Sequence, residues 1–188
     1  VSLERERPKD RAGGAPHPWL HGNERPGGLV ETRSGWINMK RSVVMSTRTG
    51  GCACGSVSYE VNGEPELMHN CHCKGCQRLT GSTFKMGSFW LEDSLKILKG
   101  DMTTYTRTAD SGRTVESQFY KVCGTTVVTL AEAQLGRVGL AVGTFDDTTW
   151  ITSPDNIFCS SKQKWYQLPE GVLKKSHAYN SDDYLESD

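Results

Sequence analysis

The sequence has no excess of charge of either sign, no long apolar run and no sustained helical pattern, and each absence excludes a class of protein. Its 188 residues include 22 Lys and Arg against 22 Asp and Glu, so no basic surface for nucleic acid is indicated. No apolar run approaches the roughly 18 residues that a membrane span requires, and the N-terminal residues lack the apolar segment of a secretory signal. We therefore expect a soluble, cytoplasmic protein that binds neither nucleic acid nor a membrane.

The first part of the chain differs in composition from the rest. Residues 1–50 contain four of the seven prolines and none of the seven cysteines. They show no period of 2 or 3.6 residues, so they could bury little apolar surface to offset the entropy of ordering. We predict a flexible tail, or an added or upstream extension, over residues 1–47. A single domain over residues 48–175 and an acidic C-terminal tail over residues 176–188 follow.

Short alternating segments separated by turn residues fill the predicted domain. Val57, Tyr59 and Val61 alternate with polar residues, and Asn62-Gly63 is typical of a hairpin turn. Further strand-like segments are residues 88–91, 95–98, 103–106, 115–120, 125–130 and 137–142, whereas only residues 73–79 and a short piece near Asp155 look helical. The sequence thus predicts a mainly β, antiparallel fold with metal ligands on loops between strands.

The cysteines fall into close groups along the chain. They are Cys52 and Cys54, then Cys71, Cys73 and Cys76, and finally Cys123 and Cys159. Cysteines one or two residues apart are poorly placed to pair with each other but well placed to bind one ion. The spacing therefore favours metal ligation in a reducing compartment over disulfides.

Two candidate zinc sites follow from these groups. Cys71, Cys73 and Cys76 supply three of the four ligands that zinc prefers. A distant residue in the fourth position would give a structural site, and water or substrate there would give a Lewis-acid site; the spacing does not decide between them. Cys52, Cys54 and Cys123 would form a second site that joins distant segments but lacks a fourth sulfur.

The order of these motifs resembles the glutathione-dependent formaldehyde-activating enzyme family, which includes centromere protein V. The resemblance covers about residues 50–168 and rests on Gly51-Cys52-x-Cys54-Gly55-x-Val57, Cys71-His72-Cys73-x-x-Cys76 with Gly81-Ser82, Phe119-Tyr120-x-x-Cys123-Gly124-Thr125, Gly143-Thr144-Phe145-Asp146-Asp147, Ile157-Phe158 and Trp165. It implies an Mss4-like β fold with one structural and one catalytic zinc ion. By position, Cys52, Cys54 and Cys123 would belong to the structural ion, and Cys71, Cys73 and Cys76 to the catalytic one.

Tyr120 departs from the pattern of the family. It stands where the family has the first cysteine of a Cys-x-x-Cys pair, and a phenol is a poorer zinc ligand than a thiol unless the metal removes its proton. The structural site could therefore hold zinc through three sulfurs plus water or Tyr120, recruit Cys159, or hold no metal. The simplest alternative makes Tyr120 a packed aromatic residue on a strand and Cys159 a small buried residue.

The resemblance implies a zinc-dependent carbon-sulfur lyase, or a related enzyme, that forms or breaks glutathione adducts of a carbonyl or other small electrophile. Cys71, Cys73 and Cys76 would be the catalytic residues, with one or two zinc ions as cofactor and glutathione as co-substrate. Lys74, Arg78 and Lys85 could attract an anionic tripeptide, and Gly81 and Ser82 would line the entrance. The alternative is a non-catalytic, zinc-stabilised binding module, since a fold does not fix a function.

Overall fold

A computed structural model describes residues 46–152 and 154–177. The described residues belong to one compact unit, Met45–Asp188. The predicted N-terminal extension lies outside them except for its last two residues, and so does nearly all of the predicted acidic tail. No helix among the described residues is long and apolar enough to cross a membrane.

Strands are the main regular structure of the described residues, and the longest helix among them has seven residues. The strands are β1 Thr47–Gly51, β2 Ser58–Asn62, β3 Leu67–Cys71, β4 Lys85–Leu91, β5 Leu95–Lys99, β6 Thr103–Thr108, β7 Thr114–Phe119, β8 Thr126–Ala131, β9 Arg137–Ala141 and β10 Asp155–Ile157. Helix α1 spans Lys74–Thr80, and short 3-10 turns occupy Glu92–Ser94, Glu132–Gln134, Val142–Thr144 and Cys159–Ser161.

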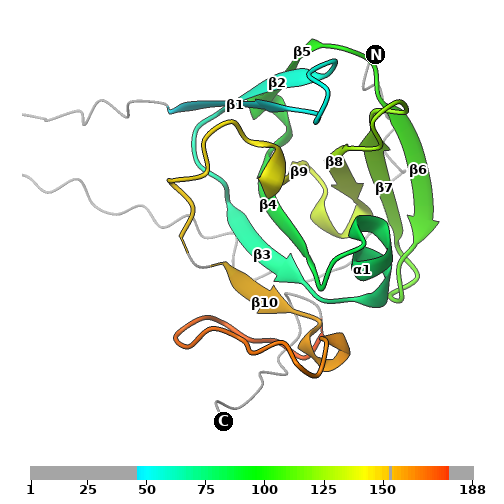
Figure 1. Ribbon diagram of the computed structural model, residues 1–188, viewed down its shortest axis with the longest axis vertical. Coiled ribbons are helices and arrows are strands. Elements are labelled where there is room, and N and C mark those ends of the chain that lie inside the picture. The colour runs from blue at the N-terminus through cyan, green and yellow to red at the C-terminus, as the bar shows by residue number, and fades with distance from the viewer. Residues whose placement is uncertain (1–45, 153, 178–188) are drawn as a thin grey trace, which may run out of the picture. The chain divides into compact units, whose positions relative to one another are not determined.

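The strands form two sheets (Figure 1). Within the described residues, the smaller sheet has the order β1-β2-β5 and the larger has the order β10-β3-β4-β9-β8-β7-β6. Neighbouring strands run antiparallel except β10, which pairs in parallel with β3. The prediction of a mainly β, antiparallel fold is confirmed.

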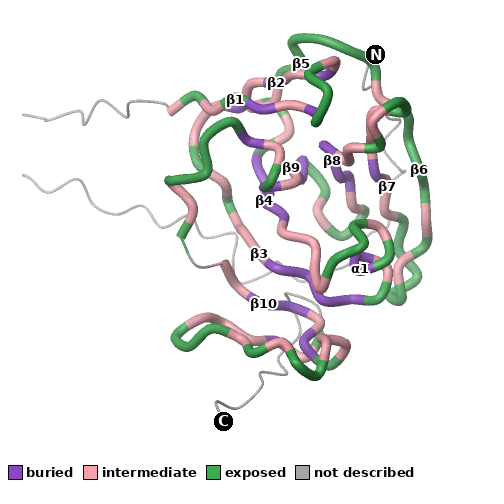
Figure 2. The backbone as a smooth tube through the Cα atoms, viewed as in Figure 1, coloured by how far each residue is buried: buried purple, intermediate pink, exposed green. Residues whose placement is uncertain are grey.

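The core follows from the alternation of apolar and polar residues along the strands. In β2, Tyr59 and Val61 are fully buried while their neighbours are partly exposed, as expected when alternate side chains face opposite sides of a sheet. The strands of the larger sheet contribute Trp90, Val127 and Leu140 to the same core. Figure 2 shows buried residues on β4, β8 and β9, and a second group where the end of β3 lies near β10 and α1.

Two local predictions are wrong. The piece near Asp155 is strand β10 and not a helical turn, because its backbone pairs with His69–Cys71 of β3; the helical turn comes later, at Cys159–Ser161. The Asn62-Gly63 turn does not join a hairpin either, since β2 pairs with β1 and β5. Gly63, at φ +89°, instead turns the chain out of the smaller sheet toward β3 in the larger one.

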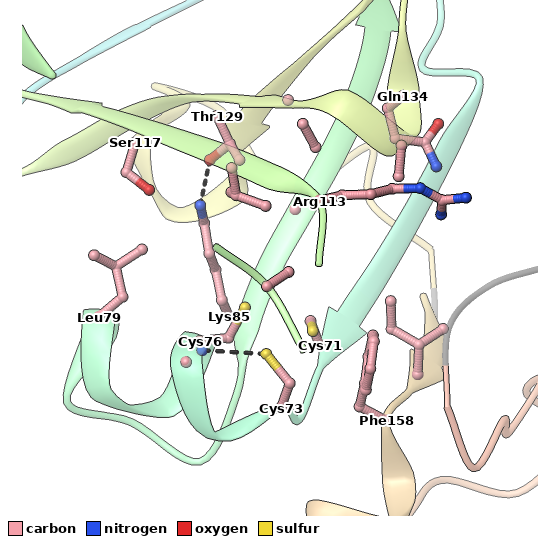
Figure 3. A pocket seen from close by; sticks show the side chains of 18 of the residues that line it. Cys71, Cys73, Cys76, Leu79, Lys85, Arg113, Ser117, Thr129, Gln134 and Phe158 are labelled. Carbon is pink, nitrogen blue, oxygen red and sulfur yellow. Dashed lines mark hydrogen bonds between the residues drawn. The ribbon is translucent and has the colours of Figure 1, made fainter. Parts of the chain in front are cut away.

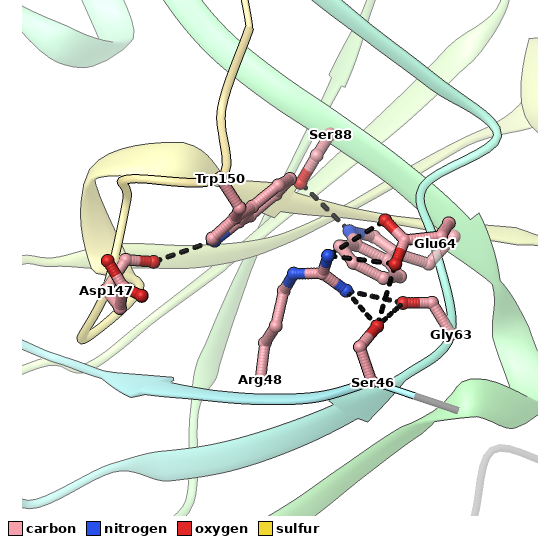
Figure 4. A network of polar contacts seen from close by, with 8 residues as sticks. Ser46, Arg48, Gly63, Glu64, Ser88, Asp147 and Trp150 are labelled. Atoms are coloured by element: carbon pink, nitrogen blue, oxygen red, sulfur yellow. Dashed lines mark hydrogen bonds and ion pairs between the residues drawn. The ribbon is translucent and has the colours of Figure 1, made fainter. Parts of the chain in front are cut away.

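An arginine network connects the first strand to the larger sheet (Figure 4). Arg48 of β1 donates to the carbonyl oxygen of Gly63 at 2.5 Å and to both carboxylate oxygens of Glu64 at 2.8 and 3.0 Å. Its guanidinium also lies 4.3 Å from the ring centroid of Trp150 and 5.5 Å from that of Trp90. A cation over an indole face is attracted to it, so this side chain helps to fix the smaller sheet on the core.

Candidate functional site

The first cysteine cluster forms where β3 runs into α1. Cys71 is the last residue of β3, Cys73 is the N-cap of α1, and Cys76 lies in the first turn. The Cys73 sulfur accepts a hydrogen bond from the Cys76 backbone N–H at 3.3 Å, as N-cap side chains do. All three side chains are buried, and their sulfur atoms lie within 4.8 Å of one another.

This geometry fits a zinc ion. Zinc binds thiolates at about 2.3 Å in a tetrahedron, which places neighbouring sulfurs about 3.8 Å apart. The donor set consists of three soft thiols without a hard oxygen ligand, which suits zinc better than magnesium or calcium. Three protein donors leave one tetrahedral position for a further ligand.

The thiols of the first cluster differ in pKa. Hydrogen bonds from the thiols of Cys71 and Cys76 lower the pKa of Cys73 to about 2. The same contacts, together with burial, raise the pKa of Cys71 well above its usual range. One thiolate is therefore stabilised by two neighbouring thiols, and a metal that binds all three sulfurs must displace the remaining protons.

The segment that carries Cys71, Cys73 and Cys76 is held in place by residues far away in the sequence. The Gln77 side-chain amide donates to the backbone oxygens of His72 at 2.6 Å and Ser161 at 2.9 Å. His72, fully buried between the two cysteines, places Nε2 3.0 Å from the Asn156 side-chain oxygen. Its side chain therefore takes part in holding β10 and does not belong to the sulfur cluster.

The cluster opens on a cavity of about 200 Å³ (Figure 3). Leu79, Phe89 and Phe158 provide part of its apolar lining. Lys85 of β4 also lines it and donates a hydrogen bond to the Thr129 hydroxyl; Figure 3 shows the lysine amine turned toward Thr129 and Ser117. Burial lowers the pKa of Lys85, and the buried Ser117 hydroxyl has no hydrogen-bond partner among the described residues.

The structure separates the predicted substrate-binding residues from this cavity. Lys74 is exposed and donates to the Ser161 carbonyl oxygen at 3.0 Å. Arg78, Gly81 and Ser82 are exposed at the other end of α1, where Gly81 at φ +64° ends the helix. None of these four residues belongs to the lining of the cavity. Of the basic residues that the sequence singled out, only Lys85 does.

Sequence reasoning missed two arginines that line the cavity, Arg107 of β6 and Arg113 of the turn before β7. Neither lies near a cysteine in the sequence. Arg107 stands in Thr103-Thr104-Tyr105-Thr106-Arg107-Thr108, a pattern typical of an exposed strand. The sequence contains no local signal for their position, because only the order of strands in the larger sheet brings β6 and β7 to the cavity.

The second cysteine cluster joins the β1–β2 loop to the β7–β8 turn. The sulfurs of Cys52, Cys54 and Cys123 lie within 4.8 Å of one another; Cys52 is buried and Cys54 is exposed. The Thr125 hydroxyl accepts the Ala53 N–H at 3.1 Å and lies 3.2 Å from the Cys123 sulfur. Hydrogen bonds from Thr125 lower the pKa of Cys123 to about 6. This thiol therefore deprotonates readily, as a zinc ligand must.

Tyr120 and Cys159 have different surroundings from the thiols of the two cysteine clusters. Tyr120 packs against the main hydrophobic core, and its carbonyl oxygen accepts the N–H of Gly124 at 2.8 Å within the turn that carries Cys123. Cys159 is buried and belongs to neither cluster among the described residues. Burial raises the pKa of Cys159, which is the behaviour of an inert core thiol.

One comparison with known proteins covers both cysteine clusters. The family model described as "Glutathione-dependent formaldehyde-activating enzyme" matches residues 47–161, a range that contains every cysteine. No curated protein matched the chain. A crystal structure of a Rhodobacter sphaeroides protein is similar at 20% identity and a TM-score of 0.44, over 53% of this chain and 89% of that one. By the family match, the chain belongs to the glutathione-dependent formaldehyde-activating enzyme family.

Proposed function

We propose that the protein is a zinc-dependent carbon-sulfur lyase, or a related enzyme, acting on glutathione adducts of a carbonyl or other small electrophile. The observation that carries this proposal is the buried set of Cys71, Cys73 and Cys76, whose sulfurs lie within 4.8 Å of one another beside a cavity. A purely structural zinc site would need a fourth protein ligand. Here the open side of the cluster faces space for a small molecule.

The residues of the site would have two roles, since some would bind the metal ion and others would surround the substrate. Cys71, Cys73 and Cys76 would hold the catalytic zinc ion. When bound, zinc supplies a Lewis acid that favours the thiolate form of a thiol placed in its open position. The apolar lining of the cavity, including Leu79 and Phe158, would keep water away from the reacting atoms.

In the direction of addition, the substrate sulfur forms a bond to the carbonyl carbon, and the carbonyl π electrons move to the oxygen, which then takes a proton. In the direction of cleavage the same bond breaks, the hydroxyl loses its proton, and the sulfur keeps the bonding electrons. Lys85 is the candidate for stabilising the charge on that oxygen. Its amine lies in the cavity, held by the Thr129 hydroxyl, and a fixed cation acts strongly where water is excluded.

The second cluster supports a structural role. Zinc held by Cys52, Cys54 and Cys123 would fix the β1–β2 loop to the β7–β8 turn, with Tyr120 or water as the fourth ligand. Both sites require reduced thiols, so we propose that the protein works in a reducing compartment such as the cytoplasm. Its partner would be a small-molecule thiol adduct.

The decisive test compares Cys73→Ser with Cys159→Ala, which alters a buried cysteine outside both clusters. We expect Cys73→Ser to lose about one zinc ion per chain and its binding of glutathione, measured by calorimetry, while far-ultraviolet circular dichroism shows an intact β fold. Cys159→Ala should keep both. If folded, zinc-loaded wild-type protein binds no glutathione or adduct, the protein is a zinc-stabilised binding module and the proposal fails.

A further inference from the structure

Arg107 reaches the cysteine cluster from a strand at the edge of the larger sheet. Its guanidinium lies so close to Gly75, between Cys73 and Cys76, that a Cβ on this glycine would be 3.0 Å from the guanidinium carbon and from one terminal nitrogen. The side chain lines the same cavity as the three cysteines.

Arg107 forms no ion pair with a carboxylate in the described part of the protein. The ion pairs found there join Arg48 to Glu64, Lys96 to Glu60 and Arg137 to Glu66. The Nε atom of Arg107 is buried without a hydrogen-bond partner among these residues. A buried donor on a charged group is costly unless it is paired, so the cavity leaves a donor for a ligand to satisfy.

The surroundings favour an anionic ligand. Lys85 and Arg113 also line the cavity, and Asp110 is the acidic residue among the described residues of the lining. Neither Lys85 nor Arg113 takes part in the ion pairs of the described residues. A guanidinium presents a planar fork of N–H groups that matches a carboxylate with two parallel hydrogen bonds, whereas a single thiolate cannot accept such a pair.

We propose that Arg107 is the specificity-determining residue for the thiol substrate: it binds a carboxylate of the ligand whose sulfur lies at the Cys71-Cys73-Cys76 cluster. This inference rests on the proposed function, because it takes the sulfur of the ligand to occupy the open position of the cluster. The enzyme would then select thiols that carry a carboxylate, such as glutathione, over neutral thiols of the same size.

The first test measures binding to the zinc-loaded protein by calorimetry, without any electrophile. The ligands are glutathione, glutathione with either carboxylate converted to an amide, and the smaller pair 3-mercaptopropionate and 3-mercaptopropionamide. We expect the wild type to prefer the free carboxylate by about tenfold to a hundredfold, as charge-assisted hydrogen bonds give. Arg107→Gln should abolish the preference, and Lys164→Gln, which removes a charge at an exposed residue outside the cavity lining, should keep it.

A second variant displaces the guanidinium without removing its charge. Gly75→Ala places a methyl group 3.0 Å from the guanidinium of Arg107, which is tight enough that the guanidinium must shift. Alanine is favoured over glycine in a helix such as α1. We expect it to reduce the preference for the carboxylate at unchanged zinc content. Zinc content and circular dichroism of both variants establish that the cluster and the fold are intact.

The possible outcomes separate this inference from the proposed function. If Arg107→Gln weakens the acid and the amide equally, Arg107 supports only the cysteine cluster and the inference is wrong. The inference also fails if the wild type binds acid and amide alike. If 3-mercaptopropionate shows an Arg107-dependent preference while glutathione does not bind, the inference holds and the assignment of glutathione fails.

Discussion

Replacing Arg48 by methionine tests whether the network in Figure 4 fixes the first strand to the core. The side chain of Arg48 is only 14% exposed, and methionine fills similar space without charge. The substitution removes the hydrogen bonds to Gly63 and Glu64 and the contact with the face of Trp150. We therefore expect a loss of stability with little change in packing volume.

The size of the loss follows from the separate contacts. Contact with an indole face at 4.3 Å contributes about 1 kcal/mol in a partly buried setting. The hydrogen bond to the Gly63 carbonyl contributes about 1 to 2 kcal/mol because its donor is charged. The ion pair adds less than about 1 kcal/mol, since Glu64 is 69% exposed. The sum predicts that Arg48→Met lowers the free energy of unfolding by about 2 to 4 kcal/mol.

Urea unfolding of the zinc-loaded protein, followed by tryptophan fluorescence and by circular dichroism, measures this loss. A double-mutant cycle with Trp150→Leu isolates the contact of the guanidinium with the ring, and we expect a coupling of about 0.5 to 1 kcal/mol. A total loss below about 0.5 kcal/mol, or no coupling between the two substitutions, would refute the reasoning.

Two further predictions concern the second cluster and the response to acid. Tyr120→Cys should supply a fourth sulfur beside Cys123 and raise the zinc content per chain; a content unchanged at about two ions, one for each cluster, would show that the site is already complete. Hydrogen bonds from Arg48 and Ser46 lower the pKa of Glu64 below its usual value of 4.5. Because the folded-state pKa is depressed, this stabilisation is present above pH 4.5 and is lost as the pH falls through the folded-state value. Glu64→Gln should therefore lower the free energy of unfolding, measured with urea, by less than about 1 kcal/mol at pH 7 and by a smaller amount at pH 3. Equal losses at both pH values would contradict the role of this carboxylate.

The sequence predicted most strands because alternation of apolar and polar residues is a local property. Tyr59 and Val61 show it plainly, and β2 lies where the pattern indicates. Strand β10 was missed because its three residues are too few to show a period. Its conformation depends on parallel pairing with β3, a long-range contact that no local pattern records.

The same distinction applies to the candidate site. The spacing of Cys71, Cys73 and Cys76 is local, and the structure brings their sulfurs together. The basic residues of the cavity depend on the order of strands instead. Arg78 was predicted to bind substrate because it lies close to Cys76 in the sequence, but it is exposed and outside the cavity lining. Arg107 reaches the cavity from β6. A basic residue close to the cysteine motif in the sequence was therefore a poor predictor of a basic residue in the cavity lining.

The two cysteine clusters differ in how much of the chain must be synthesised before they can form. All three sulfurs of the first lie in one short segment at the end of β3 and the start of α1. The second needs the turn after β7, and the hydrogen bond from Ala53 to Thr125 beside it joins residues 72 positions apart. If both clusters hold zinc, a chain emerging from the ribosome would be able to bind its first metal ion while the larger sheet is still incomplete. A second ion would bind only after the chain through the turn that follows β7 has been made.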